Sequence, residues 1–319
     1  MIAEKLKGYE SWMAPEVPEN IPHGDMPGDK VRITESHIQK AGTIFPVLLK
    51  KLIPVMEINP WERVVGCVCG GSGVGKSEIA SLLSWYFCCL GIGSYTLSGD
   101  NYPHRIPKYN DAERLRIFRE SALKGMVAAG DYSMERLARI RQWQRADDDA
   151  NADHAKEYPW FASYLEAGRK GLAGYLGTDR ELGFEDLEAV VAAFKSGEER
   201  IWLKRMGRAE DELWYEQVDF SGINILIIEW THGNSGRYRG VDLPILLNST
   251  PQETLAHRKA RNRDGAADSP FTTMVLEIEQ KLLESEAHKA AVILSKSGEL
   301  LSYAAYQEQM KEGGQDARK

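Results

Sequence analysis

The chain has 319 residues, 43% of them hydrophobic and 27% charged, which is the composition of an ordinary globular protein. Its formal net charge is -7 and no long basic stripe is present, which argues against a nucleic-acid partner. No apolar run approaches the roughly 20 residues that a membrane helix needs, and the charged start MIAEKLKGYE is unlike a signal peptide. Four cysteines without metal-ligand spacing favour reduced thiols in the core of a cytoplasmic protein.

The first 60 residues form an N-terminal extension ahead of the first apolar segment. Prolines between residues 15 and 27 predict irregular structure up to about residue 33, because proline fixes φ and removes a backbone donor. Thr34 is a suitable N-cap for a helix that runs to about Leu52. Pro46 lies inside this helix and is expected to kink or split it.

Five apolar segments are predicted to be strands, and helical stretches separate them. The first of them, RVVGCVC, is apolar at nearly every position, as expected of a parallel strand covered on both faces. Strands that alternate with helices indicate an α/β fold with a mainly parallel sheet and helices on both faces. The predicted strands are residues 63–69, 94–98, 223–229, 243–247 and 291–295, and the predicted helices are residues 75–89, 111–126, 251–263 and 271–288.

Residues 127–215 interrupt this alternation, because they are mostly helical in character with polar breaks. We interpret them as a cap on the core that decides the identity of the substrate. The predicted divisions are an extension and helix at 1–60, a first core part at 61–126, the helical insertion at 127–215, a second core part at 216–306 and a flexible tail at 307–319.

The segment after the first strand, GGSGVGKS, matches the phosphate-binding pattern G-x-x-x-x-G-K-[ST] at every fixed position. Glycines allow backbone angles that a Cβ forbids, so successive N–H groups can turn toward phosphate oxygens at the start of a helix. Lys76 would reach the β- and γ-phosphates of ATP, and the Ser77 hydroxyl would bind Mg²⁺. The predicted nucleotide ligands are Gly70, Gly71, Ser72, Gly73, Val74, Gly75, Lys76, Ser77 and Glu78.

A polar turn, Gly99-Asp100-Asn101, follows the second predicted strand. Ligands of parallel sheets bind beyond the carboxyl ends of the strands, so Asp100 is expected at the same edge as the phosphate-binding loop. Its carboxylate could accept the proton of an attacking hydroxyl or hold Mg²⁺ through water. Asn101, Tyr102 and Arg105 are candidate substrate contacts, and an ordinary Asx turn is the alternative.

The later segment NILIIEWTHGN repeats this arrangement, since an apolar strand ends at Glu229 and a polar turn follows. P-loop proteins often carry the Walker B carboxylate at this place, where it serves the Mg²⁺ shell or orients the acceptor. Which of Asp100 and Glu229 is the base and which serves the metal stays open. His232 is a further candidate for the substrate site; the alternatives are a charge that merely closes a strand and a solvated loop histidine.

A basic stretch late in the chain contains Arg258, Arg261 and Arg263. Arg258 and Arg261 are three residues apart, so they share one face of the predicted helix. Such a cluster could close over the triphosphate and neutralise charge during phosphoryl transfer, with Arg261 as a catalytic residue. A solvated basic face is the alternative.

In this order, the phosphate-binding loop, the Gly-Asp-Asn turn, the Glu229 strand and the arginine cluster resemble the uridine kinase, phosphoribulokinase and pantothenate kinase group. The resemblance covers about residues 60–126 and 180–300. It implies a three-layer P-loop kinase fold with five parallel strands and the P-loop strand in the centre. It also implies that Asp100 is the base, because in that group an aromatic residue, here Tyr102, follows the corresponding aspartate.

The resemblance to the uridine kinase group also suggests a substrate-binding role for part of the insertion and a possible dimeric assembly. Residues 181–187 weakly resemble the acidic segment before the substrate loop of that group, and Arg205 after them could hold an acidic substrate. A packed amphipathic helix with a charged outer face is the alternative. Kinases of this group are often dimers, so a homodimer is compatible with the resemblance.

A second resemblance is to adenylylsulfate kinases. The run Leu97–Asn101 followed by Arg105 is similar to their Gly-Asp-Asn segment. Their usual Lys-Ser-Thr reads Lys76-Ser77-Glu78 in this chain, and their compact domain has no long helical insertion.

The sequence therefore predicts a kinase that uses ATP and Mg²⁺ to phosphorylate a hydroxyl of a small metabolite such as a nucleoside, a sugar or a sugar acid. An adenylylsulfate kinase-like enzyme, and an ATPase or nucleotide sensor without a small acceptor, are the alternatives. The acidic turn after the second strand favours an acceptor site, and the chain has no guanine-specificity motif N-K-x-D.

Overall fold

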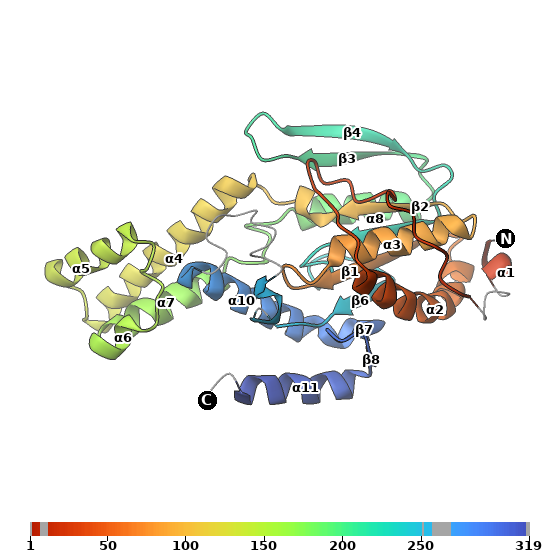
Figure 1. Ribbon diagram of the computed structural model, residues 1–319. Helices are drawn as coiled ribbons and strands as arrows, with labels where there is room; N and C mark the ends of the chain where they lie inside the picture. Colours follow the sequence, from red (N-terminus) through yellow and green to blue (C-terminus); the bar gives the residue numbers. More distant parts are fainter. Residues whose placement is uncertain (1, 7–11, 251, 257–268, 317–319) are drawn as a thin grey trace. The chain divides into compact units, whose positions relative to one another are not determined.

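The computed structural model describes residues 2–6, 12–250, 252–256 and 269–316 (Figure 1). The predicted arginines Arg258, Arg261 and Arg263 lie outside these described residues. The chain divides into two compact units. The first comprises Met1–Tyr102, Phe184–Ser249 and Leu283–Lys319, and the second comprises Pro103–Gly183 and Thr250–Leu282.

A six-stranded sheet forms the centre of the first unit, in the order β2-β5-β1-β6-β7-β8. The first five strands in this order are parallel, and β8 pairs antiparallel with β7 at the edge. The expected mainly parallel sheet with a central P-loop strand is confirmed, and one short antiparallel strand extends it. The strands are β1 (Val64–Gly70), β2 (Ser94–Ser98), β5 (Ile225–Glu229), β6 (Leu243–Leu247), β7 (Val292–Leu294) and β8 (Leu300–Leu301).

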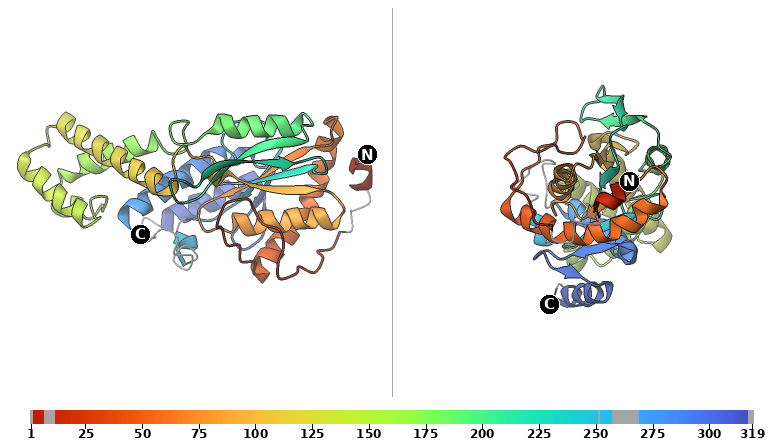
Figure 2. Two further views of the ribbon diagram at one scale, coloured as in Figure 1. Left: turned by 90° about the horizontal axis from the view of Figure 1, so that it is seen from above. Right: turned by 90° about the vertical axis from the view of Figure 1, so that its right-hand side faces the viewer.

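Burial explains why these short segments are strands. Every residue of β1, β5 and β6 is buried, as expected where both faces of a parallel sheet are covered. Alternate β1 side chains, Val64 and Val68, join one apolar cluster with the helices α2 (Glu35–Ile58) and α3 (Lys76–Cys89). Figure 2 shows α8 (Phe184–Lys195) on the side of the sheet opposite α3, which gives three layers.

Of the kink or split expected at Pro46, the split does not occur in α2. Thr34 and His37 form a capping box at its start, as its N-cap position suggested. The helix then continues through Pro46 and Pro54 to Ile58 instead of splitting. A buried stripe that includes Ala41, Phe45, Leu48 and Leu52 anchors it on both sides of Pro46, so packing outweighs the lost backbone bond.

The region expected to be a helical insertion also contains an antiparallel hairpin. Strands β3 (Arg200–Met206) and β4 (Leu213–Asp219) pair with each other and with no other described strand. They follow α8 in the chain and belong to the first unit. The remaining elements of this unit are α1 (Ile2–Leu6), η1 (Gly99–Asn101), η2 (Ala287–Lys289) and α11 (Tyr303–Asp316), the last of which runs into the stretch expected to be a tail.

The second unit is helical and has its own apolar core. Phe118, Phe161, Tyr164 and Met274 are among the residues of that core. Arg119 donates two hydrogen bonds to the buried Asp149 carboxylate, at 2.9 and 2.7 Å, and so joins two segments of the unit. Its helices are α4 (Pro107–Ala129), α5 (Met134–Arg145), α6 (His154–Glu157), α7 (Phe161–Ala173) and the start of α10 (Pro270–Glu286).

All four cysteines are free thiols, as the sequence predicts. Cys67 and Cys69 are buried on β1, but Cys88 and Cys89 are exposed at the end of α3, which corrects the expectation that all four lie in the core. In the part of the chain that the structure describes, no helix combines the length and apolar character required to cross a bilayer.

Candidate active site

The loop between β1 and α3 has the backbone that the glycine pattern predicts. Gly70, Gly73 and Gly75 have φ values of 152°, 78° and 96°, a range that side chains strongly disfavour. A Cβ on Gly70 would stand 2.6 Å from the Leu247 carbonyl oxygen, so only glycine fits beside β6. The Lys76 ammonium donates to the Gly71 carbonyl at 3.1 Å and therefore lies over the loop.

The first turn of α2 also reaches this loop. A Cβ added to Gly75 would lie 3.0 Å from Nε2 of His37, the residue of the α2 capping box. Glu78 is buried in the first turn of α3. The N-terminal extension therefore packs directly against the loop.

The carboxyl ends of β5, β1 and β2 bring together a buried polar cluster. Glu229 at the end of β5 accepts a hydrogen bond from the Ser77 hydroxyl at 3.1 Å and one from the Ser98 hydroxyl at 2.6 Å. Its register partners are Val68 on β1 and Ser98 on β2. The cluster joins the P-loop helix to the strand before the Gly-Asp-Asn turn, and sequence reasoning did not select Ser98.

Burial dominates the electrostatics of Glu229. The pKa of this carboxyl is raised to about 8, first by burial and then by the nearby Asp100 carboxylate, while Ser98, Lys76 and Ser77 act in the opposite direction. Glu229 is only 4% exposed, so it lacks water to stabilise its charge. A cation at this place would favour the ionised form.

The Gly-Asp-Asn turn forms the 3-10 segment η1 directly after β2. Asp100 is exposed, whereas its neighbour Asn101 is fully buried. The Asn101 side chain accepts a hydrogen bond from the Met206 amide on β3 at 3.0 Å. Asp100 is therefore the accessible carboxylate of this edge, and Glu229 is the enclosed one.

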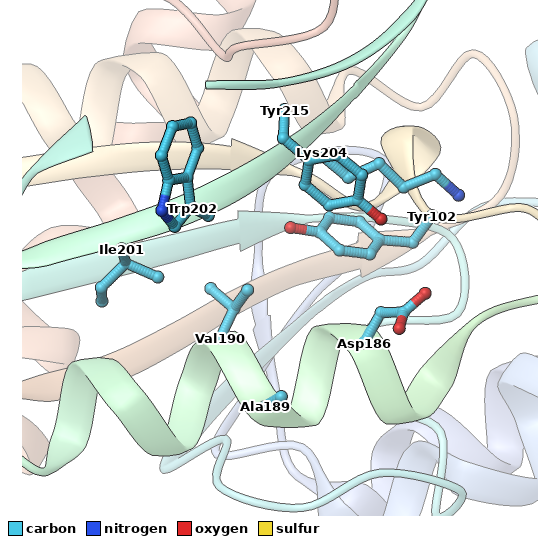
Figure 3. A pocket seen from close by; sticks show the side chains of 8 residues that line it. All are labelled: Tyr102, Asp186, Ala189, Val190, Ile201, Trp202, Lys204 and Tyr215. Atoms are coloured by element: carbon cyan, nitrogen blue, oxygen red, sulfur yellow. The ribbon is translucent and has the colours of Figure 1, made fainter. Parts of the chain in front are cut away.

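A cavity of about 220 Å³ lies between α8 and the β3–β4 hairpin (Figure 3). Asp186 and Val190 rise from α8 toward the hairpin side chains. The hydroxyl of Tyr102 is buried and has no hydrogen-bond partner among the described residues. The cavity is lined by Tyr102, Asp186, Ala189, Val190, Ile201, Trp202, Lys204 and Tyr215.

The lining combines aromatic surface with two charged groups. Trp202 and Tyr215 are 59% and 58% exposed, so their rings are open to a ligand. Burial lowers the pKa of the Lys204 ammonium, and the Asp186 carboxylate opposes this effect. Apolar rings with a few polar groups are typical of small-molecule sites.

The Arg205 side chain is held by hydrogen bonds within the protein, so it is not a free ligand for a substrate. Its guanidinium donates to Asp25 at 2.8 Å, to the Tyr95 hydroxyl at 2.9 Å and to Glu216 at 3.0 Å. The Arg205 side chain is 5% exposed. Asp25 lies in the proline-rich segment where the sequence analysis found no candidate.

The remaining candidates have separate surroundings. His232 lies in the turn after β5, with its ring against that of Trp230 at 5.5 Å between centroids. Arg105 belongs to the second unit, where it donates to the Tyr175 hydroxyl at 3.1 Å and lies 3.9 Å from the Glu113 carboxylate. Each of these contacts is internal to one unit.

The fold and the site together define a class: an α/β protein with a phosphate-binding loop after its central strand β1, a carboxylate at the end of the neighbouring β5, and another in the turn after β2, the strand next to β5. No protein-family model matches the chain. The chain is 38% identical over 263 residues to the bifunctional α-galactosidase/sucrose kinase AgaSK of Mediterraneibacter gnavus. The match covers 82% of this chain and 23% of that relative, so the chain spans less than a quarter of the relative's length.

Solved structures of kinases are among those that align with the chain. A possible uridine kinase from Bacillus stearothermophilus aligns with a TM-score of 0.38 at 15% identity, over 77% of this chain and 98% of that one. A D-glycerate 3-kinase from Cryptococcus neoformans aligns with a TM-score of 0.42 at 12% identity, over 84% of this chain and 98% of that one.

Proposed function

We propose that this chain is an ATP-dependent kinase that transfers the γ-phosphoryl group to a hydroxyl of a small metabolite, with a sugar as the favoured acceptor class. One observation carries the proposal. The Ser77 hydroxyl of the phosphate-binding loop and the buried Glu229 carboxylate are 3.1 Å apart, and Glu229 also accepts from the hydroxyl of Ser98, the residue before the turn that contains Asp100. The residues proposed to bind phosphate, to bind metal and to accept the proton thus come from one edge of the sheet.

The donor set fits Mg²⁺. This ion usually takes one or two protein oxygens and completes its shell with water and substrate phosphates. Ser77 and Glu229 offer such oxygens, and no cluster of three or more His, Cys, Asp or Glu side chains suited to a metal occurs among the described residues. Bound there with the nucleotide, Mg²⁺ would neutralise charge on the phosphates.

The protein side chains have distinct tasks in the proposed reaction. Lys76 and the loop amides hold the β- and γ-phosphates of ATP. The acceptor oxygen forms a bond to the γ-phosphorus while the bond to the β–γ bridging oxygen breaks, and ADP leaves with that electron pair. Asp100, the exposed carboxylate, takes the proton of the acceptor hydroxyl. Arg261, with Arg258 and Arg263, would neutralise charge over the phosphates.

The cavity beside Tyr102 is the proposed acceptor site. Tyr102 follows the Asp100 turn directly, so the cavity adjoins the proposed base. Its aromatic rings can pack on the apolar face of a sugar ring, while Lys204, Asp186 and the Tyr102 hydroxyl can hydrogen-bond its hydroxyl groups. The relative that carries the name sucrose kinase makes sucrose the first acceptor to test.

The experiment measures ADP release from Mg·ATP across a panel of sucrose, fructose, glucose, glycerate, uridine and adenylylsulfate. We expect one sugar to raise ADP release. Asp100→Asn should lower this rise by about 10²–10⁴-fold while ATP still binds, and Lys76→Ala should lower it by about 10²–10³-fold.

Other outcomes would reassign the function. A rise with adenylylsulfate alone would favour the adenylylsulfate kinase-like alternative. Steady ADP release that no acceptor changes, equal in wild type and Asp100→Asn, would favour an ATPase. Nucleotide binding without turnover would favour a sensor.

A further inference from the structure

The carboxylate of Asp25, in the N-terminal extension, is surrounded by hydrogen-bond donors from β2, η1 and β3. Its Oδ1 accepts hydrogen bonds from the Ser98 amide at 2.7 Å and the Asn101 side chain at 3.1 Å. Its Oδ2 accepts from the Tyr95 hydroxyl at 3.0 Å and from Arg205 at 2.8 Å. The Asp25 side chain is 9% exposed, so these contacts replace water.

Two of these contacts bracket the proposed base. Ser98 precedes Asp100 by two residues and Asn101 follows it directly, so one carboxylate holds both sides of the turn. Asn101 is fully buried and is also bonded to the Met206 amide at 3.0 Å. Asp25 therefore contacts the chain on both sides of Asp100.

The same contacts reach the other parts of the site. Ser98, whose amide is held by Asp25, donates its hydroxyl to Glu229 at 2.6 Å. Arg205 follows Lys204, a residue of the acceptor cavity, along β3. Asp25 thus bonds directly to the segment around Asp100, and is linked to the buried Glu229 through Ser98 and to the cavity wall through Arg205, the neighbour of Lys204.

The backbone before Asp25 lies over Glu229. A Cβ added to Gly24 would stand 3.9 Å from the Cγ and Oε1 atoms of Glu229 and 3.5 Å from the Thr96 methyl group. This part of the extension has no helix or strand, so its order must come from tertiary contacts. The extension consequently encloses the carboxylate that the proposed function assigns to the metal.

We propose that Asp25 is a positioning residue of the active site, which fixes the Asp100 turn against Glu229 and against the cavity wall. The proposal rests on the kinase function proposed above, because it takes Asp100 as the base. Its predicted consequence is a loss of turnover without a loss of nucleotide binding, since the phosphate-binding loop makes none of the contacts of Asp25 given above.

The test compares Asp25→Asn with the matched control Asp29→Asn. Asp29 lies in the same extension and accepts a hydrogen bond from the amide of its neighbour Lys30. We expect Asp25→Asn to lower kcat by about 10–100-fold, as for a misplaced catalytic group. The Kd for Mg·ATP should change by less than about threefold, and Asp29→Asn should match wild type in both.

Amide hydrogen exchange over residues 97–102 gives a readout that does not need activity. Asp25→Asn should speed exchange there, and Asp29→Asn should not. Tyr95→Phe removes only one of the donors to Asp25 and serves as a milder variant if Asp25→Asn does not fold; it should lower kcat by about 3–10-fold. The proposal is overturned if either folded variant keeps the wild-type kcat, or if exchange over 97–102 is unchanged.

The two proposals fail in different ways. If no acceptor stimulates the wild-type protein, the kinase function fails, whereas faster exchange in Asp25→Asn would still establish that Asp25 orders the turn. If wild type is an active kinase and Asp25→Asn is equally active, only the positioning role fails.

Discussion

The Ser77 hydroxyl and the Glu229 carboxylate form a buried hydrogen bond of 3.1 Å between positions 152 residues apart in the chain. The bond joins the first turn of α3, the helix after the central strand β1, to the last residue of β5, the strand beside β1. A hydroxyl that serves Mg²⁺ in phosphate-binding loops thus faces a carboxylate that is protonated more readily than usual. The protonation state of Glu229 should therefore be coupled both to stability and to metal binding.

Stability should depend on pH through Glu229. Its pKa is about 8 in the folded protein, against 4.5 for an ordinary glutamate, so the folded state binds this proton more tightly. The stabilising contribution is complete below about pH 4.5 and is lost as pH rises through about 8, by at most about 5 kcal/mol. Denaturant unfolding from pH 5 to 9 should show this loss in wild type and not in Glu229→Gln, with the exposed Glu16→Gln as control.

Mg²⁺ binding should also depend on the ionisation of Glu229. Mg²⁺ favours the ionised carboxylate, so binding of Mg·nucleotide at pH 7 should release a proton from Glu229. Calorimetry in buffers of different ionisation enthalpy measures this release, which should be smaller in Glu229→Gln. Equal release in both proteins would place the metal away from Glu229.

Gly70 should tolerate no side chain. Alanine there would bring its Cβ to 2.6 Å from the Leu247 carbonyl oxygen, in a backbone with φ of 152°. We expect Gly70→Ala to lower the free energy of unfolding by about 2–4 kcal/mol and to weaken nucleotide binding at least tenfold. Thermal unfolding and nucleotide titration measure the two effects.

Gly91 provides the matched control for this substitution. It also has a left-handed backbone, with φ of 70°, but a Cβ there would have nothing within 4 Å. Gly91→Ala should therefore cost about 1–2 kcal/mol of stability and leave nucleotide affinity unchanged. Equal effects of the two substitutions would show that backbone strain, not the contact with β6, makes Gly70 necessary.

The sheet and the phosphate-binding loop were predictable because their signals are local. Strands such as Ile225–Glu229 are buried on both faces, so each residue is apolar until the polar strand end. The glycine spacing of the loop likewise lies within eight consecutive residues. Glu229 could be selected because it ends such a strand, and Asp100 because it lies in the polar turn directly after β2.

The hairpin and Asp25 could not be predicted in the same way. Strand β4 is exposed at nearly every position and shows no apolar alternation, so its sequence carries no strand pattern. Asp25 lies among prolines, and its partner Arg205 is 180 residues away. Contacts at such separation depend on the assembled fold and leave no local periodicity.

The acceptor cavity can be tested with two tryptophans of one hairpin. Trp202 on β3 lines the cavity, whereas Trp214 on β4 does not. Both are exposed, at 59% and 44%, so neither substitution should disturb the core. Trp202→Ala should raise KM for the sugar acceptor by about tenfold, as expected from the loss of a stacking surface worth about 1–1.5 kcal/mol.

Trp214→Ala should leave the KM for the acceptor within about twofold of wild type, and both variants should keep the wild-type KM for ATP. Initial rates over a matrix of acceptor and ATP concentrations separate these constants. If Trp214→Ala raised the acceptor KM as much as Trp202→Ala, this KM would depend on the hairpin as a whole and not on the cavity lining. If neither changed it, the acceptor would bind elsewhere, and the cavity beside Tyr102 would lose its proposed role.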